Sequence, residues 1–161
     1  MYKIVAVLSL LLLAACADER AGISPEVTRM REDAARDACI SRELYTRAEE
    51  SYVTLAELHG IDDPGIDPSA ALLPGPVRAA YTYAQVYHQH AELRRSAFAH
   101  IDSAFNHVRS PADSTRHIQL ANNVSPPRAE PGTIEANVAA AYARDHTAIR
   151  QDDDHRCNWD L

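Results

Sequence analysis

The sequence predicts an all-α fold, an irregular three- to four-helix bundle built on a long antiparallel helix hairpin. Glycine and proline, which interrupt helices, fall in clusters and leave long stretches free of both after Pro25, Pro76 and Gly132. Within these stretches alanine is abundant, and apolar residues recur every three or four positions, as they do on one face of a helix. No segment alternates apolar and polar residues with a period of two, so we predict no strands.

The first helix is predicted from Pro25 to about His59. Ser24 is suited to be its N-cap, Pro25 to be its first residue, and Gly60 to end it. Its apolar positions form one stripe that should face a partner helix. The stripe consists of Val27, Met30, Ala34, Ala38, Leu44, Ala48, Tyr52, Leu55 and Leu58.

The second helix, predicted from about Pro76 to Val108, has the clearest periodicity in the chain. One apolar seam repeats every seven residues, through Val77, Ala84, Ala91, Phe98 and Phe105. A second seam follows three residues further on, through Ala80, Tyr87, Ile101 and Val108, and only Arg94 interrupts it. At 1.5 Å per residue both long helices would extend about 50 Å. The Asp-, Pro- and Gly-rich turn between them therefore predicts an antiparallel hairpin.

Two shorter helices are predicted after the hairpin. Ser110 is suited to be an N-cap and Pro111 the first residue of a helix of about three turns. The segment NVSPPRAEPG then reads as a linker, because prolines favour extended backbone before them. The last helix is predicted to begin after Thr133 and to fade near Gln151. Its apolar face would consist of Ile134, Val138, Ala141, Tyr142 and Ile149.

The first sixteen residues, MYKIVAVLSLLLLAAC, have the layout of an export signal. A positive charge at Lys3 precedes an apolar core that is too short to span a membrane as a helix. The core ends in Leu13-Ala14-Ala15-Cys16, which resembles the lipobox of bacterial lipoproteins. That resemblance implies cleavage before Cys16 and lipidation of its thiol and amine with acyl chains such as palmitate, an anchor stronger than a single chain. The alternative is an ordinary signal peptide cut elsewhere, which would leave Cys16 as an odd thiol.

The resemblance also implies the organisation and location of the chain. Residues 1–15 would be the signal peptide, residues 16–24 the lipidated cysteine and a short tether, and residues 25–161 a single helical domain. About 146 of the 161 residues would remain, enough for one domain with its own core. Ala17 after the cysteine, with Asp18 only at the next position, implies the outer membrane of a Gram-negative bacterium, with the domain facing the periplasm.

Composition argues against several classes of function. Lys3 is the only lysine, so the mature chain would have none for a Schiff base or a Ser/Lys dyad. Fifteen arginines against 23 acidic residues give the mature chain a net charge of about −8, which disfavours binding to nucleic acid. GxSxG, SxxK and CxxC motifs are absent, as are glycine-rich phosphate loops. We therefore predict a non-enzymatic protein without a cofactor.

The remaining cysteines are predicted to form a disulfide bond. If Cys16 carries lipid, export leaves Cys39 and Cys157 together in an oxidising compartment. Cys39 lies outside the apolar stripe of the first helix, so the C-terminal tail should pack against the outer flank of that helix. A metal site of Asp152, Asp154, His155 and Cys157 is the alternative, but this mixture of hard and soft ligands suits no single metal.

The eight histidines give little indication of a metal site, because no two are three or four residues apart. His146 differs from the other histidines because it lies on the apolar face of the last helix. In an up-and-down bundle it would approach Met30 on the first helix. A Met and a His from the first and last helices are similar to the axial ligands of soluble b-type cytochrome bundles. A haem- or metal-binding bundle is therefore an alternative function.

Tyr83, Tyr87, His90 and Arg94 form a stripe along one edge of the second helix. Aromatic residues and arginine are enriched where proteins bind one another, so this stripe is the predicted partner surface. Burial against one of the shorter helices is the competing interpretation. Overall, we expect a lipid-anchored envelope lipoprotein with a structural or protein-binding role.

A second resemblance concerns the cysteines. An early cysteine and the terminal DxxC from Asp154 to Cys157 are similar to features of the Cys-bridged lysozyme-inhibitor-like proteins. Those proteins have a Trp and an Arg ahead of the last cysteine, whereas Trp159 follows it here, and their early LNxxY element is missing. A lysozyme-inhibitor-like envelope protein is thus a further alternative.

Overall fold

The computed structural model describes residues 25–61, 72–107, 111–125, 129–152 and 155–157. Four helices make up most of these residues: α2 (Pro25–Leu58), α3 (Gly75–His107), α4 (Pro111–Asn122) and α5 (Ile134–Gln151). The described ranges contain no strand. The predicted all-α class is confirmed, and each helix lies where the sequence places it. The signal segment, Cys16, the tether, Ser24, Val108, Ser110, Asp154 and Trp159 fall outside the described residues.

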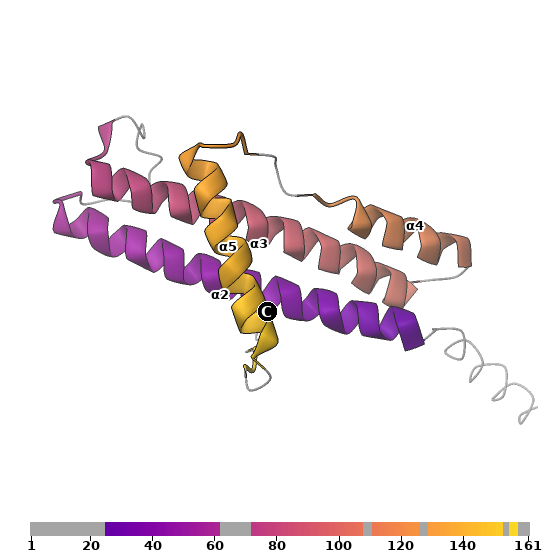
Figure 1. The fold of residues 1–161 in the computed structure, drawn as a ribbon. Helices are drawn as coiled ribbons and strands as arrows, with labels where there is room; N and C mark the ends of the chain where they lie inside the picture. Colours follow the sequence, from indigo (N-terminus) through magenta and orange to yellow (C-terminus); the bar gives the residue numbers. More distant parts are fainter. Residues whose placement is uncertain (1–24, 62–71, 108–110, 126–128, 153–154, 158–161) are drawn as a thin grey trace, which may run out of the picture.

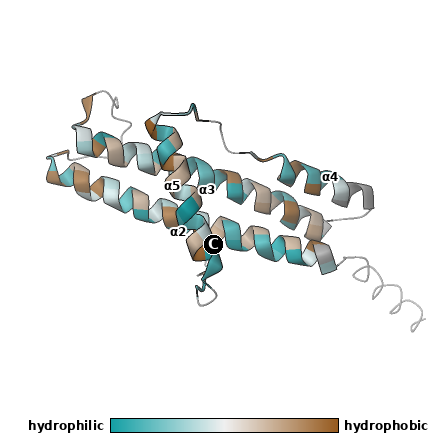
Figure 2. Ribbon diagram, viewed as in Figure 1, coloured by the Kyte–Doolittle hydropathy of each residue, from teal (hydrophilic) through white to brown (hydrophobic). Residues whose placement is uncertain are grey.

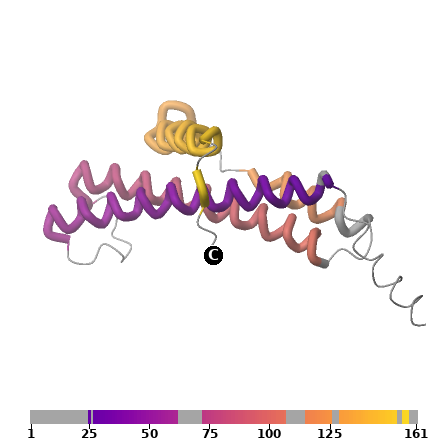
Figure 3. The backbone as a smooth tube through the Cα atoms, turned by 90° about the horizontal axis from the view of Figure 1, so that it is seen from below, coloured from indigo at the N-terminus to yellow at the C-terminus, as the bar shows by residue number. Residues whose placement is uncertain are grey.

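The two long helices pack along their length as an antiparallel hairpin, which is the most extensive helix contact in the structure (Figure 1). α4 returns beside α3, and α5 crosses both long helices steeply on one face of the hairpin (Figures 1 and 3). The up-and-down arrangement that the haem alternative assumed for the last helix is therefore not present. The C-terminal half of α5 is instead held at the middle of α2, by polar contacts and by the tail that follows it.

Local signals explain where the helices end. Gly60 has a φ of 73°, and its N–H donates to the carbonyl of Glu57 while the N–H of Ile61 donates to that of Ala56. This Schellman motif needs the left-handed backbone that glycine adopts without strain. At the start of α5, the Oγ1 atom of Thr133 accepts a hydrogen bond from the Ala136 N–H at 3.2 Å. Both predicted helix boundaries are confirmed.

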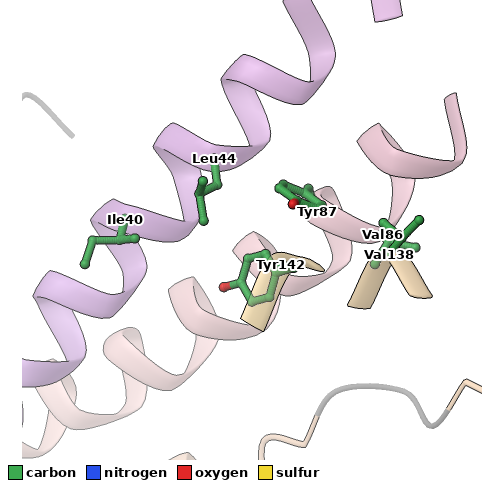
Figure 4. Packing of buried hydrophobic residues seen from close by; sticks show 6 residues of the cluster. All are labelled: Ile40, Leu44, Val86, Tyr87, Val138 and Tyr142. Atoms are coloured by element: carbon green, nitrogen blue, oxygen red, sulfur yellow. The ribbon is translucent and has the colours of Figure 1, made fainter. Parts of the chain in front are cut away.

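The core consists of two apolar clusters. The first lies where α5 crosses the hairpin, so all three helices contribute to it (Figure 4). It contains Ile40, Leu44, Val86, Tyr87, Val138 and Tyr142. The second lies between the turn-proximal ends of α2 and α3 and contains Tyr52, Ala56, Leu73, Val77 and Ala84. Burying each large aliphatic side chain of these clusters contributes roughly 1.5–3 kcal/mol to stability.

Most buried positions of α3 lie in its predicted seams, although Val86 and Ala104 are buried outside them. The buried positions of α2 also agree with its predicted stripe only in part. Leu58 belongs to the predicted stripe of α2 but is 77% exposed. Ile40 and Ser41 lie outside that stripe and are completely buried. The difference arises because the middle of α2 contacts α3, α5 and the C-terminal tail together, and so buries more than one face.

Hydrophilic and hydrophobic residues are mixed along the visible sides of the helices (Figure 2). Among the residues that the structure describes, no helix is both long and apolar enough to cross a membrane.

Candidate functional site

A buried polar cluster lies beneath α5, beside the first apolar cluster. We call it the Asp37 cluster; its members are Asp37 and Ser41 of α2, His90 and Arg94 of α3, and Tyr142, His146 and Arg150 of α5. Asp37, Ser41 and His146 are all more than nine-tenths buried. Because buried polar groups are costly unless they are paired, their contacts decide how α5 sits on the hairpin.

Asp37 is the acid at the centre of this cluster. Arg150 donates a hydrogen bond to its Oδ1 atom, and Arg94 approaches its Oδ2 atom to 3.5 Å. The Nε2 atom of His146 lies 3.4 Å from the main-chain oxygen of Asp37 and 3.9 Å from its Oδ1 atom. At the solvent edge, Arg150 also contacts Asp33 at 3.1 Å. One buried carboxylate thus joins cationic side chains from α3 and α5 to α2.

Hydroxyl groups and rings complete the cluster. Ser41 Oγ lies 2.6 Å from the Tyr142 hydroxyl and donates to the main-chain oxygen of Asp37, also at 2.6 Å. The ring of His90 stacks on the Tyr142 ring with centroids 4.1 Å apart. The ring of His146, also on α5, has its centroid 5.6 Å from that of Tyr142. Burial raises the pKa of Tyr142, so its hydroxyl remains a neutral hydrogen-bonding group.

Both histidines in the cluster favour the neutral form. Burial lowers the pKa of His146; the attraction of Asp37 opposes this effect, while Arg94 and Arg150 add to it. Burial also lowers the pKa of His90, and the charges of Arg94 and of protonated His146 act in the same direction. Desolvation therefore outweighs the single carboxylate, which two guanidinium groups already share.

Ser41, His146 and Asp37 are the residue types of a hydrolase triad, but their arrangement differs from one. Ser41 is fully buried, and its Oγ atom donates to a main-chain oxygen. His146 directs Nε2 toward the main-chain oxygen of Asp37. A nucleophilic serine needs a base that takes its proton and a path for substrate, and these contacts provide neither. The cluster is better suited to positioning α5.

Next to the cluster, an open groove of about 400 Å³ lies between α5 and the hairpin. Its lining is mainly apolar, with one cationic and one anionic side chain. The lining residues are Leu44, Arg47, Ala48, Ser51, Tyr83, Tyr87, Asp145, Ala148 and Ile149. A second hollow continues from Arg47 and Ser51 along α2 to Leu55. Concave, mainly apolar surfaces with a few polar groups are typical binding sites.

The predicted partner stripe on α3 is partly covered by α5. The Tyr87 hydroxyl donates to Asp145 at 2.8 Å, and its pKa is raised by burial and by this carboxylate. His90 stacks on Tyr142, and Arg94 pairs with Asp37. Tyr83 is 42% exposed at the edge of the groove, and the side chain of Arg94 remains 48% exposed beside its contact with Asp37. The stripe is therefore partly covered, because three of its four side chains contact residues of α5 or α2.

The two proposed haem ligands do not share one position. His146 lies against Asp37, while Met30 lies seven residues earlier on α2, a rise of about 10 Å along its axis. Elsewhere, the rings of His100 and His117 approach to 6.4 Å across α3 and α4. Within the described parts of the chain, no group of three or more His, Cys, Asp or Glu residues could hold a metal ion.

The predicted disulfide bond between Cys39 and Cys157 is present, with Cα atoms 6.0 Å apart. Neighbouring contacts hold the tail on the same flank of α2: Arg36 donates to the main-chain oxygen of Asp152 at 3.0 Å, and His155 lies 3.0 Å from Glu43. Cys157 also packs against the first apolar cluster. Oxidation removes Cys157 as a thiolate ligand of the metal site considered for the tail, and Asp154, another of its four residues, lies outside the described residues.

Sequence reasoning missed Asp37 and Ser41, which look like ordinary polar residues of a solvated helix face. Arg94 was the available signal, because it interrupts an otherwise apolar seam of α3. A charge at a seam position requires an opposite charge on the element packed against it. The structure provides that charge from Asp37.

Comparison of the chain with protein-family models, with curated proteins and with solved structures finds no significant match. Functional inference therefore rests on the groove, the Asp37 cluster and the sequence around Cys16.

Proposed function

We propose that this protein is a lipid-anchored envelope lipoprotein with a non-enzymatic role, and that it binds a protein partner through the groove between α5 and the hairpin. The observation that carries the proposal is the groove itself, which is open, mainly apolar and bordered by the exposed ring of Tyr83. Partly exposed tyrosines at a concave surface are typical anchors of protein–protein contacts.

The anchor rests on the lipobox-like run ending in Cys16. Only nine positions separate Cys16 from Pro25, where α2 begins, so the chain between them spans at most about 30 Å. The groove begins near Leu44, nineteen residues further along α2, a rise of about 30 Å. This length would limit the partner to proteins at or near the same membrane.

Replacing Cys16 with serine is expected to abolish lipidation and release the domain from membranes. Labelling cells with an alkyne analogue of palmitate tests this directly, because the label should join the wild-type chain and be lost from Cys16→Ser. Fractionation should then move the variant to the soluble periplasmic fraction. Labelling of the variant equal to that of the wild type would contradict the anchor. Cys39→Ser is the matched control and should retain the label.

A photoreactive amino acid at Ser51, inside the groove, is expected to form an adduct with a specific envelope protein. Photochemical crosslinking suits this chain because Lys3 is the only lysine, so amine-reactive reagents have little to attack. The same photoreactive residue at Thr46, exposed on α2 but outside the lining, should give no such adduct.

Ala148→Arg then tests the groove itself. Ala148 is exposed, so the larger side chain should fill the groove, abolish the Ser51 adduct and leave the melting temperature almost unchanged. An adduct that survives Ala148→Arg, or that forms equally from Thr46, would contradict binding in the groove.

A further inference from the structure

We propose that α5 is a pH-sensitive latch, which the Asp37 cluster holds on the hairpin near neutral pH and releases when His90 and His146 take up protons. The inference concerns the folded domain alone and does not depend on the lipid anchor or on the partner in the groove. It rests on the contacts beneath α5 and on the balance of charge among them. It also rests on the second apolar cluster, which contains no residue of α5.

The positive and negative charges beneath α5 are equal in number only while both histidines are neutral. Asp37 of α2 faces the site, and Asp33 of α2 lies at its edge. The other groups that face it are Arg94 and His90 of α3 and His146 and Arg150 of α5. The carboxyl group of Asp145, also on α5, is engaged by Tyr87. Two carboxylates therefore match two guanidinium groups. Two further protons would leave two positive charges without partners.

The geometry prevents Asp37 from compensating for those protons. Its Oδ1 atom already accepts from Arg150, and its Oδ2 atom faces Arg94. His146 is only 3.9 Å from Oδ1, and its closer neighbour is a neutral main-chain oxygen. His90 contacts the Tyr142 ring at 4.1 Å, which offers a cation weak attraction, while Arg94 lies one turn further along α3.

The direction of the pH effect follows from these environments. The pKa values of His90 and His146 lie below the ordinary 6.5 while α5 is seated, because burial disfavours the charged ring. Released side chains regain the ordinary value, so the open form binds more protons. Acidification below about pH 6.5 therefore favours the open form, and the effect levels off below the lowered values.

The rest of the fold allows α5 to move without unfolding the hairpin. The second apolar cluster is built only from α2, α3 and Leu73 just before α3, and it contains no histidine. Gly132, with a φ of 85°, precedes α5 and supplies a flexible backbone position. The Cys39–Cys157 bond follows α5 and would keep the released helix tethered. Opening would uncover Leu44, Val86 and Tyr87 of the first apolar cluster (Figure 4).

Hydrogen exchange of the oxidised mature chain at pH 7.5 and pH 5.5, corrected for intrinsic rates, tests the latch. Protection of α5 amides should fall on the order of tenfold, which corresponds to one pKa unit of net proton linkage. Amides around Tyr52 and Val77 should keep their protection, and a hydrophobic dye should bind at the lower pH. Unchanged α5 protection, or loss at the same pH around Tyr52 and Val77, would overturn the proposal.

The variant His90→Gln/His146→Gln should remove the pH dependence of α5 exchange, whereas His59→Gln, at an exposed position after α2, should leave it intact. Retention of the full dependence in the double variant would overturn the latch. Imidazole resonances of the wild-type chain supply a measurement that requires no variant. His90 and His146 should both titrate below the ordinary value of 6.5, and titration of both at or above that value would also contradict the proposal.

Discussion

Replacing Cys39 with serine is expected to destabilise the oxidised protein by about 4 to 5 kcal/mol. The bond joins residues 118 positions apart, so its loss restores much conformational freedom to the unfolded chain. In a domain of this size each kcal/mol corresponds to about 2–4 °C, which predicts a fall in melting temperature of about 8–20 °C. Cys157 should become a free thiol in the same variant.

Thermal unfolding followed by circular dichroism, together with thiol titration, measures both effects. Reduction of the wild-type protein should give the same melting temperature as Cys39→Ser. The matched control Cys39→Ser/Cys157→Ser should show the same loss of stability without the thiol. A variant with unchanged melting temperature and no reactive thiol would show that the bond does not form in solution.

Replacing Asp37 with asparagine is expected to cost about 2 to 3 kcal/mol of stability. Removing one partner of a fully buried ion pair costs roughly 3–5 kcal/mol, because the remaining charge is left without compensation. The carboxyl side chain is only 12% exposed, but Arg94 and Arg150 are 48% and 39% exposed. Water therefore compensates part of their charge, which lowers the expected loss.

Asp33→Asn is the matched control, because Asp33 contacts the same Arg150 but is 57% exposed. Exposed ion pairs contribute roughly 0–1 kcal/mol, so this variant should remain close to the wild type in urea denaturation. Asp37→Asn should also increase hydrogen exchange in α5 more than around Val77. Equal losses in the two variants would mean that burial of the Asp37 carboxylate has no special role.

The helices were predictable because their signals are local. Pro25 and Pro111 at first helical positions, Thr133 as an N-cap and Gly60 as a terminator act through their own backbone neighbourhoods. The seven-residue repeat of α3 likewise predicted which of its faces is buried. These interactions span only a few residues, so they can be read without knowing what lies across the interface.

The candidate site was predictable only in fragments. Arg94 was recognised as an interruption of an apolar seam and was assigned to a partner surface, yet it pairs with Asp37 of α2. His146 was recognised on an apolar face, but its contact is the main chain of Asp37 and not Met30. Periodicity shows that a face is covered without showing which element covers it.

By itself the sequence determined the helical class, the positions of the four helices and the pairing of Cys39 with Cys157. Helix propensity, capping and the inventory of cysteines are local or compositional properties, which explains their success. Only the tertiary structure decided that α5 crosses the hairpin, covers part of the stripe on α3 and gathers charged groups around Asp37. That crossing depends on long-range complementarity of charge and shape between helices more than a hundred residues apart, which no single segment encodes.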